Sequence, residues 1–142
     1  MKPFLFLLIL ILGPLSTARS GDPEWANAKL AKEAPQKLLT VELFTIGAVG
    51  GPGSISRSEV WFRAMLQLPD AVAECQKLIS NASPAGQLYG LLGLRRLDHT
   101  AFDEALPKFK DAKAPVRTMV GCILTECSTG AVASGIEKGT TK

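Results

Sequence analysis

Apolar residues recur at helical spacing through the middle of the chain, between residues 56 and 81. A capping-box pattern, Ser56-Arg57-Ser58-Glu59, predicts the start of one helix, and Pro69 predicts its end. The expected inward residues of this helix are Val60, Trp61, Ala64, Met65 and Leu68. A second helix is expected after Asp70, with Ala71, Val72, Cys75, Leu78 and Ile79 on a single apolar face.

The segment 84–97 has a different pattern, because its apolar residues cover nearly every side. Ser83 and Pro84 are typical N-cap and first-turn residues, so a helix is predicted to begin there. A helix that is apolar all round is a buried one. Three glycines, Gly86, Gly90 and Gly93, fall on one stripe, and each costs about 1 kcal/mol in helix propensity relative to alanine. We expect this stripe to let a neighbouring backbone pack closely, although a groove for a ligand or partner helix is an alternative.

The remaining segments predict shorter elements. Asp22-Pro23-Glu24 is typical of a helix start, and this helix is expected to end before Pro35. A strand is predicted over 38–49, followed by a Gly-rich loop over 47–55. Further elements are a helix capped by Thr100 and interrupted at Pro107, an extended segment or strand over 116–124, a weak helix over 131–138 and a mobile tail over 139–142. The predicted fold class is mainly α: a small helical bundle, or HEAT-like helix pairs, around the glycine-striped helix, with one or two short strands.

The N-terminus matches a secretory signal peptide. Met1-Lys2 is followed by the apolar run 4–12, the break Gly13-Pro14 and several small residues. Cleavage after Ala18 or after Ser20 fits the pattern, and the run is far shorter than the roughly 20 residues that a membrane anchor needs. We therefore expect a signal peptide over 1–20 and a single exported domain over 21–142, periplasmic or extracellular. No later stretch is long enough to predict a membrane span after cleavage.

Charge gives no indication of nucleic-acid binding. The formal net charge is +3, with 16 basic and 13 acidic residues. Two of the basic residues, Lys2 and Arg19, belong to the expected signal peptide. Arg95-Arg96 is the only adjacent basic pair, so no basic stripe is present for a phosphate backbone. Another envelope or extracellular protein is the partner that the sequence favours.

The three cysteines are Cys75, Cys122 and Cys127, and an exported chain is expected to oxidise one pair of them. Cys122 and Cys127 are five positions apart, so bridging them would need a tight turn between them. Cys75 lies on the apolar face of its predicted helix. The favoured disulfide is therefore Cys75–Cys122, and the alternative is three reduced, buried cysteines.

Residues 83–122 resemble a domain type of small secreted bacterial proteins without assigned function. The resemblance rests on "SPAGQLYGLLGLRRLD", "AFDEAL" and "APVRTMVGC". These segments are also faintly similar to HEAT-like helical pairs, but no repeat period is present. The resemblance implies an exported helical domain, with Cys75 and Cys122 joined, and transfers no catalytic residue.

The sequence predicts no catalytic, cofactor-binding or metal site. The Gly-rich loop lacks the lysine of a phosphate-binding loop, and His99 is the only histidine. We therefore expect a non-enzymatic binding or structural module with an exposed apolar patch. One alternative is a small enzyme that uses the 47–54 loop or one of the cysteines, which predicts a pocket containing His99 or Cys127 with a second polar group in reach. Another is an envelope inhibitor or immunity-like factor that presents the loop.

Overall fold

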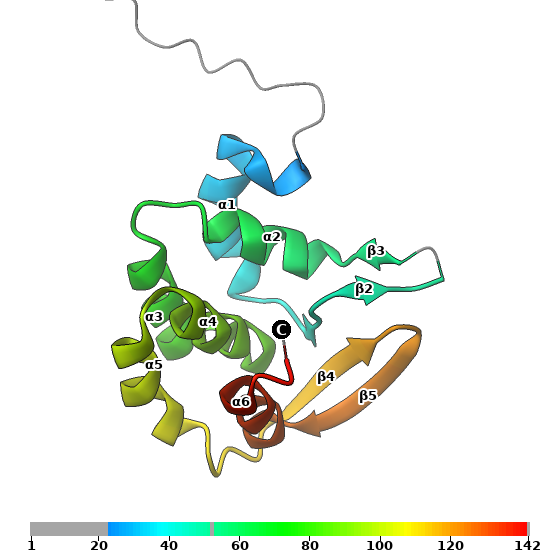
Figure 1. The fold of residues 1–142 in the computed structure, drawn as a ribbon, viewed down its shortest axis with the longest axis vertical. Coiled ribbons are helices and arrows are strands. Elements are labelled where there is room, and N and C mark those ends of the chain that lie inside the picture. Colours follow the sequence, from blue (N-terminus) through cyan, green and yellow to red (C-terminus); the bar gives the residue numbers. More distant parts are fainter. Residues whose placement is uncertain (1–22, 52, 142) are drawn as a thin grey trace, which may run out of the picture.

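The computed structural model describes residues 23–51 and 53–141 (Figure 1). The α-helices are α1 (Ala28–Leu38), α2 (Arg57–Met65), α3 (Ala71–Asn81), α4 (Pro84–Leu97), α5 (His99–Ala105) and α6 (Thr129–Lys138), with 3-10 turns at Glu24–Ala26 and Leu106–Lys108. The strands are β1 (Leu43–Phe44), β2 (Ala48–Val49), β3 (Ser54–Ile55), β4 (Pro115–Val120) and β5 (Ile123–Ser128). The expected signal peptide lies outside the described residues. Among the helices of the described part, none has the length and apolar character to cross a bilayer.

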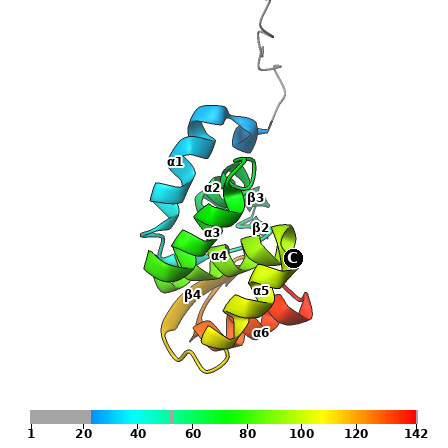
Figure 2. The same cartoon turned by 90° about the vertical axis from the view of Figure 1, so that its left-hand side faces the viewer.

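Helix α4 lies at the centre of the molecule (Figure 2). Its bounds, Pro84–Leu97, confirm the predicted helix, and the Ser83 hydroxyl accepts a hydrogen bond from the Gly86 N–H as an N-cap does. It packs against α3, α5, α6, β1 and β4, so each of its sides meets a different element. Four of its leucines and Tyr89 are almost completely buried. The predicted burial of this segment is therefore confirmed, except at Leu97, the last residue of the helix, which is exposed.

The glycine stripe of α4 faces α3 and the end of α1. A Cβ atom added at Gly90 would lie 2.6 Å from the carbonyl oxygen of Cys75 on α3. At Gly93 it would collide with the Cys75 sulfur, and at Gly86 with the carbonyl oxygen of Leu38. The stripe therefore permits backbone contact between helices, as predicted, and the helix–helix contact explains why residues of low helix propensity occupy these positions.

The predicted fold class is wrong in its account of the strands. A three-stranded mixed sheet has the order β1-β4-β5, with β1 parallel to β4 and β4 antiparallel to β5. A separate hairpin pairs β2 with β3. The described part of the chain is thus mainly α with two sheets, and it is not a bundle of helices or of HEAT-like pairs with one or two strands. Helices α4 and α6 lie beside the sheet, and the two hairpins extend from the same side of the molecule (Figure 1).

A tight turn explains why the structure has two strands where the sequence predicted one. The sequence suggested one extended segment over 116–124, but the chain reverses at Gly121-Cys122, and Val120 pairs with Ile123. Gly121 has φ +58°, whereas no residue other than glycine has positive φ among the described residues. This is the geometry of a two-residue hairpin turn with glycine in its first position. The chain can therefore return along β4 as β5, which the prediction did not include.

Three other predictions are corrected at the ends of elements. Helix α1 continues through Pro35 to Leu38, because Ala31, Ala34 and Leu38 pack into the core on the face that the helix presents inward. The strand expected over 38–49 is reduced to the two residues of β1 and the two of β2. Helix α5 is capped by the Asp98 side chain, which accepts a hydrogen bond from the Ala101 N–H, and not by Thr100.

The close approach at the glycine stripe predicts the effect of a small substitution. We expect Gly90→Ala to lower the free energy of unfolding by about 1–2 kcal/mol, because overpacking against the α3 backbone outweighs the gain in helix propensity. Gly135→Ala in α6 is the matched control. Its added methyl group would meet only the Thr140 and Thr141 hydroxyls, at 3.3 and 3.0 Å, and these side chains can yield at the cost of at most the hydrogen bond from Thr140 to the Gly135 carbonyl. Urea denaturation measures the free energy of unfolding of both variants. Equal stability of the two variants would contradict close packing as the reason for Gly90.

Candidate binding surfaces

A buried cluster of hydroxyl groups fixes β1 against α2 and α4. The Tyr89 hydroxyl of α4 accepts a hydrogen bond from the Thr45 N–H at 3.0 Å and donates to the Thr45 carbonyl oxygen at 2.8 Å. It also lies 2.9 Å from the hydroxyl of Ser58 on α2. The Ser56 hydroxyl contacts both Thr45 and Ser58. Burial raises the pKa of the Tyr89 phenol, so this group remains protonated and able to donate at neutral pH.

Glu59 extends this polar cluster toward the Gly-rich segment. Its carboxylate is buried, accepts a hydrogen bond from the Gly47 N–H at 2.7 Å and binds the Arg63 guanidinium through two hydrogen bonds of 2.9 and 2.6 Å. The Arg63 guanidinium in turn lies over the Trp25 ring. Ser56 does cap α2, as predicted, but the Glu59 side chain bonds to Gly47 and Arg63 instead. A residue that looked like part of a local capping motif therefore joins two distant segments.

The end of the β4–β5 hairpin is apolar and exposed. Val120 is 78% exposed, Ile123 is 71% exposed and Leu124 is 47% exposed. Val120 pairs with Ile123 across the hairpin, and Met119 pairs with Leu124 on the next rung. Because successive rungs face opposite sides of a sheet, apolar side chains cover both faces. We call these four residues, with the turn Gly121-Cys122, the hairpin tip.

Polar rungs lie immediately behind the hairpin tip. Thr118 pairs with Thr125, and Arg117 pairs with Glu126 one rung further back. The Gly50 N–H of the β2–β3 hairpin donates a hydrogen bond of 3.0 Å to the Gly121 carbonyl oxygen. The tip is therefore braced by the Gly-rich segment and surrounded at its base by one positive and one negative side chain.

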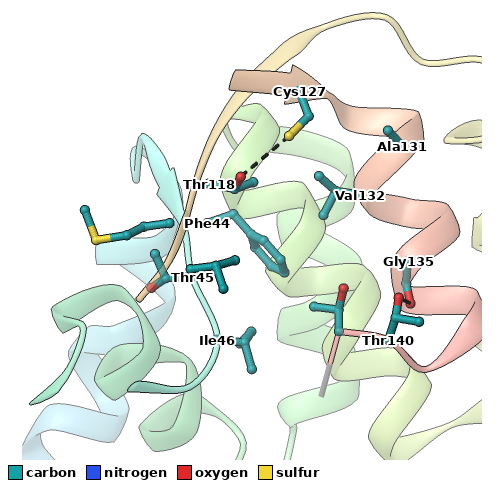
Figure 3. A pocket seen from close by; sticks show the side chains of 12 residues that line it. Phe44, Thr45, Ile46, Thr118, Cys127, Ala131, Val132, Gly135 and Thr140 are labelled. Carbon is teal, nitrogen blue, oxygen red and sulfur yellow. Dashed lines mark hydrogen bonds between the residues drawn. The ribbon is translucent and has the colours of Figure 1, made fainter. Parts of the chain in front are cut away.

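A cavity of about 340 Å³ lies between the three-stranded sheet and α6 (Figure 3). Phe44 and Ile46 line it from β1 and the segment after it, and Val132 lines it from α6. The Thr118 hydroxyl and the Cys127 sulfur, 3.5 Å apart, lie on the sheet side. The predicted tail folds back at the other end, where the Thr140 N–H donates to the Gly135 carbonyl oxygen at 3.0 Å.

The cysteines predicted to form a disulfide are not joined in the structure. Cys75 is buried between α3 and α4, Cys122 is exposed at the hairpin tip, and Cys127 is half-buried in the cavity; all three thiols are free. Burial, with a smaller contribution from the Glu74 carboxylate, raises the pKa of the Cys75 thiol to about 12. The inward position predicted for Cys75 is confirmed, but the hairpin carries Cys122 away from the core.

His99, the 47–54 loop and Cys127 are not brought together, although Cys127 lies in a cavity 3.5 Å from the Thr118 hydroxyl. His99 is exposed at the first turn of α5, where its ring contacts the edge of Phe102. The cavity that contains Cys127 does not include His99 or the loop residues 47–54. Over residues 23–51 and 53–141, no group of three or more potential metal ligands is present.

The hairpin tip was not predicted from the sequence, although a local signal for it exists. Gly121-Cys122 separates two runs of six residues, "PVRTMV" and "ILTECS", in which β-branched residues are common. Two such runs joined by Gly-X predict a hairpin. Interpreting the whole region as one strand placed Cys122 within it, and this made a bond to Cys75 look plausible.

The chain has no match among family models, curated proteins or solved structures. The resemblance to small secreted bacterial domains therefore stays a prediction.

The hydroxyl cluster predicts that losing the Tyr89 hydroxyl lowers the stability of the fold. We expect Tyr89→Phe to lower the free energy of unfolding by about 1–3 kcal/mol, because the buried Thr45 N–H and carbonyl oxygen would lose their hydrogen-bond partner. Ser58→Ala is the control, since it removes only a side-chain partner and leaves the Thr45 bonds intact. Urea denaturation should rank Tyr89→Phe as the more destabilising of the two, and the reverse order would show that β1 is held by other contacts.

Proposed function

We propose that this chain is a non-enzymatic binding module of the cell envelope or extracellular space, and that it docks onto another protein through its hairpin tip. The observation that carries the proposal is the exposure of Val120, Ile123 and Leu124 together at one projecting end. Adjacent exposed apolar side chains of this size are typical of interaction sites.

The shape of the tip favours insertion into a hollow. Val120 and Ile123 occupy one face of the hairpin, and Met119 and Leu124 occupy the other. A flat partner surface could cover only one of these faces, whereas a concave pocket could cover both. Fully burying one side chain of this kind contributes roughly 1.5–3 kcal/mol, so the tip residues would supply a substantial part of the free energy that offsets the entropic cost of association.

The charges at the base of the tip favour a protein partner over an anionic membrane. Arg117 and Glu126 lie on the same rung and have opposite signs. An apolar centre with a mixed polar rim is the usual composition of a protein interface. Attraction to anionic lipid would instead require a cluster of lysine and arginine residues around the tip.

Substitutions within the tip test the proposal. The full chain, tagged at its C-terminus and expressed in its source cells, would be isolated with bound proteins and compared with the variants Ile123→Ser and Val120→Ser. The control is Leu97→Ser, which removes another exposed apolar side chain, 44% exposed, at the end of α4. We expect a protein that binds the wild type and Leu97→Ser but is lost from both tip variants. With that protein purified, each tip substitution should weaken binding about tenfold or more, equivalent to about 1.4 kcal/mol.

Two further measurements test other occupants of the hairpin tip. Vesicles of phosphatidylethanolamine and phosphatidylglycerol test lipid binding, and sedimentation of the purified chain tests association with a second copy. Binding to vesicles that depends on the tip would show that the tip binds a membrane and not a protein. Self-association that depends on the tip would show that its partner is another copy of the chain. Identical sets of bound proteins for the wild type and Ile123→Ser would refute docking through the tip.

A further inference from the structure

We propose that the cavity between β1, β4 and α6 binds a small, uncharged and largely apolar molecule. The cavity adjoins the hairpin tip, because Met119 and Val120 line it, whereas Ile123 and Leu124 do not. The inference does not rest on the proposed docking function.

The chemistry of the walls indicates the class of ligand. Among residues 23–51 and 53–141, no aspartate, glutamate, lysine, arginine or histidine lines the cavity. The cavity is partly open to solvent, but a charged group inside it would lose part of its hydration without meeting an opposite charge from the described residues, which is costly. The volume of about 340 Å³ lies at the lower end of the range of small-molecule pockets, roughly 300–1,000 Å³. These properties select a small neutral molecule over a phosphate, carboxylate or amine.

Hydroxyl groups at two ends of the cavity indicate that the ligand also has a polar group. The Thr118 hydroxyl donates its proton to the Thr125 carbonyl oxygen at 3.3 Å. The Thr140 hydroxyl donates to the Gly135 carbonyl oxygen at 3.0 Å. A hydroxyl that donates one bond still has lone pairs that can accept another. A ligand with an O–H or N–H donor could therefore bond to Thr118 or Thr140 while its apolar part lies against Phe44 and Val132.

The wall formed by Phe44 is fixed before any ligand arrives. The Phe44 ring packs against the Tyr89 ring with centroids 4.8 Å apart. Tyr89 is itself held by its hydrogen bonds to Thr45, the residue after Phe44. A wall that does not have to reorganise lowers the entropic cost of binding.

A matched pair of fluorescent probes tests the charge argument. N-phenylnaphthylamine is neutral and has an N–H donor, and anilinonaphthalene sulfonate has the same two ring systems with an added anionic group. Titrated into the purified chain, the neutral probe should bind at least about tenfold more tightly, because the sulfonate cannot be neutralised in this cavity. Equal affinity for the two probes, or binding of neither, would overturn the proposal.

The native cysteines locate the bound probe without relying on fluorescence. Cys127 lines the cavity, whereas Cys122 is exposed at the hairpin tip and serves as a reference within the same molecule. Saturating N-phenylnaphthylamine should slow the alkylation of Cys127 by N-ethylmaleimide several-fold and leave that of Cys122 unchanged, as measured by peptide mass spectrometry. Unchanged alkylation of Cys127, or equal slowing at both cysteines, would place the probe elsewhere and refute the site.

A cavity-filling substitution completes the test. Ala131 lines the cavity, yet it is exposed in the first turn of α6, so Ala131→Phe adds a ring without disturbing the core. We expect this variant to bind N-phenylnaphthylamine about tenfold less tightly and to keep the wild-type melting temperature. Ile123→Ser is the control and should bind the probe as the wild type does. If Ile123→Ser loses the probe and Ala131→Phe retains it, the probe binds the hairpin tip and the proposal fails.

Discussion

Contact between the backbones of α3 and α4 is the constraint on which the rest of the structure depends. Because Gly90 has no side chain, the carbonyl of Cys75 can lie where a methyl group would otherwise be. This brings the two helices together closely enough for α4 to be covered on every side. Tyr89, the residue before Gly90, is consequently fixed in the core, where its hydroxyl bonds to the backbone of Thr45. The position of β1, and through it the position of the sheet, follows from how closely two helices pack.

The two candidate binding surfaces differ in how they are supported. The cavity lies against Phe44, which the packed interior holds through Tyr89. The hairpin tip projects beyond that interior, and its contacts with the β2–β3 hairpin include the hydrogen bond between Gly50 and Gly121. A preformed cavity suits a ligand that is recognised by its shape, whereas a projecting hairpin presents its side chains to a larger partner. The two proposals are compatible, because the cavity lies against the packed interior and the hairpin tip projects beyond it.

The helices were largely predictable, and the sheet was not, because the two kinds of structure depend on different ranges of sequence. The cap Ser83 and the apolar residues of 84–97 are neighbours along the chain, so their pattern is visible without knowledge of the fold. Strand β1 has only two residues, and its partner β4 lies more than half the chain away, so no local pattern indicates the pairing. In β5 both faces are largely exposed, and the alternation that normally indicates a strand is absent. The binding surfaces were missed for the same reason, since both are assembled from the sheet.

The parallel pairing of β1 with β4 also has a consequence for how the molecule acquires its structure. Contacts between segments that are distant in sequence form slowly, because a long loop must close before they contribute free energy. Helices α3 and α4 are adjacent in sequence and can associate early, whereas the sheet has to wait for residues 115–128. We therefore expect the α3–α4 pair to form before the sheet. A partly folded chain could have nearly all of its helical signal and still lack the surfaces through which it would bind anything.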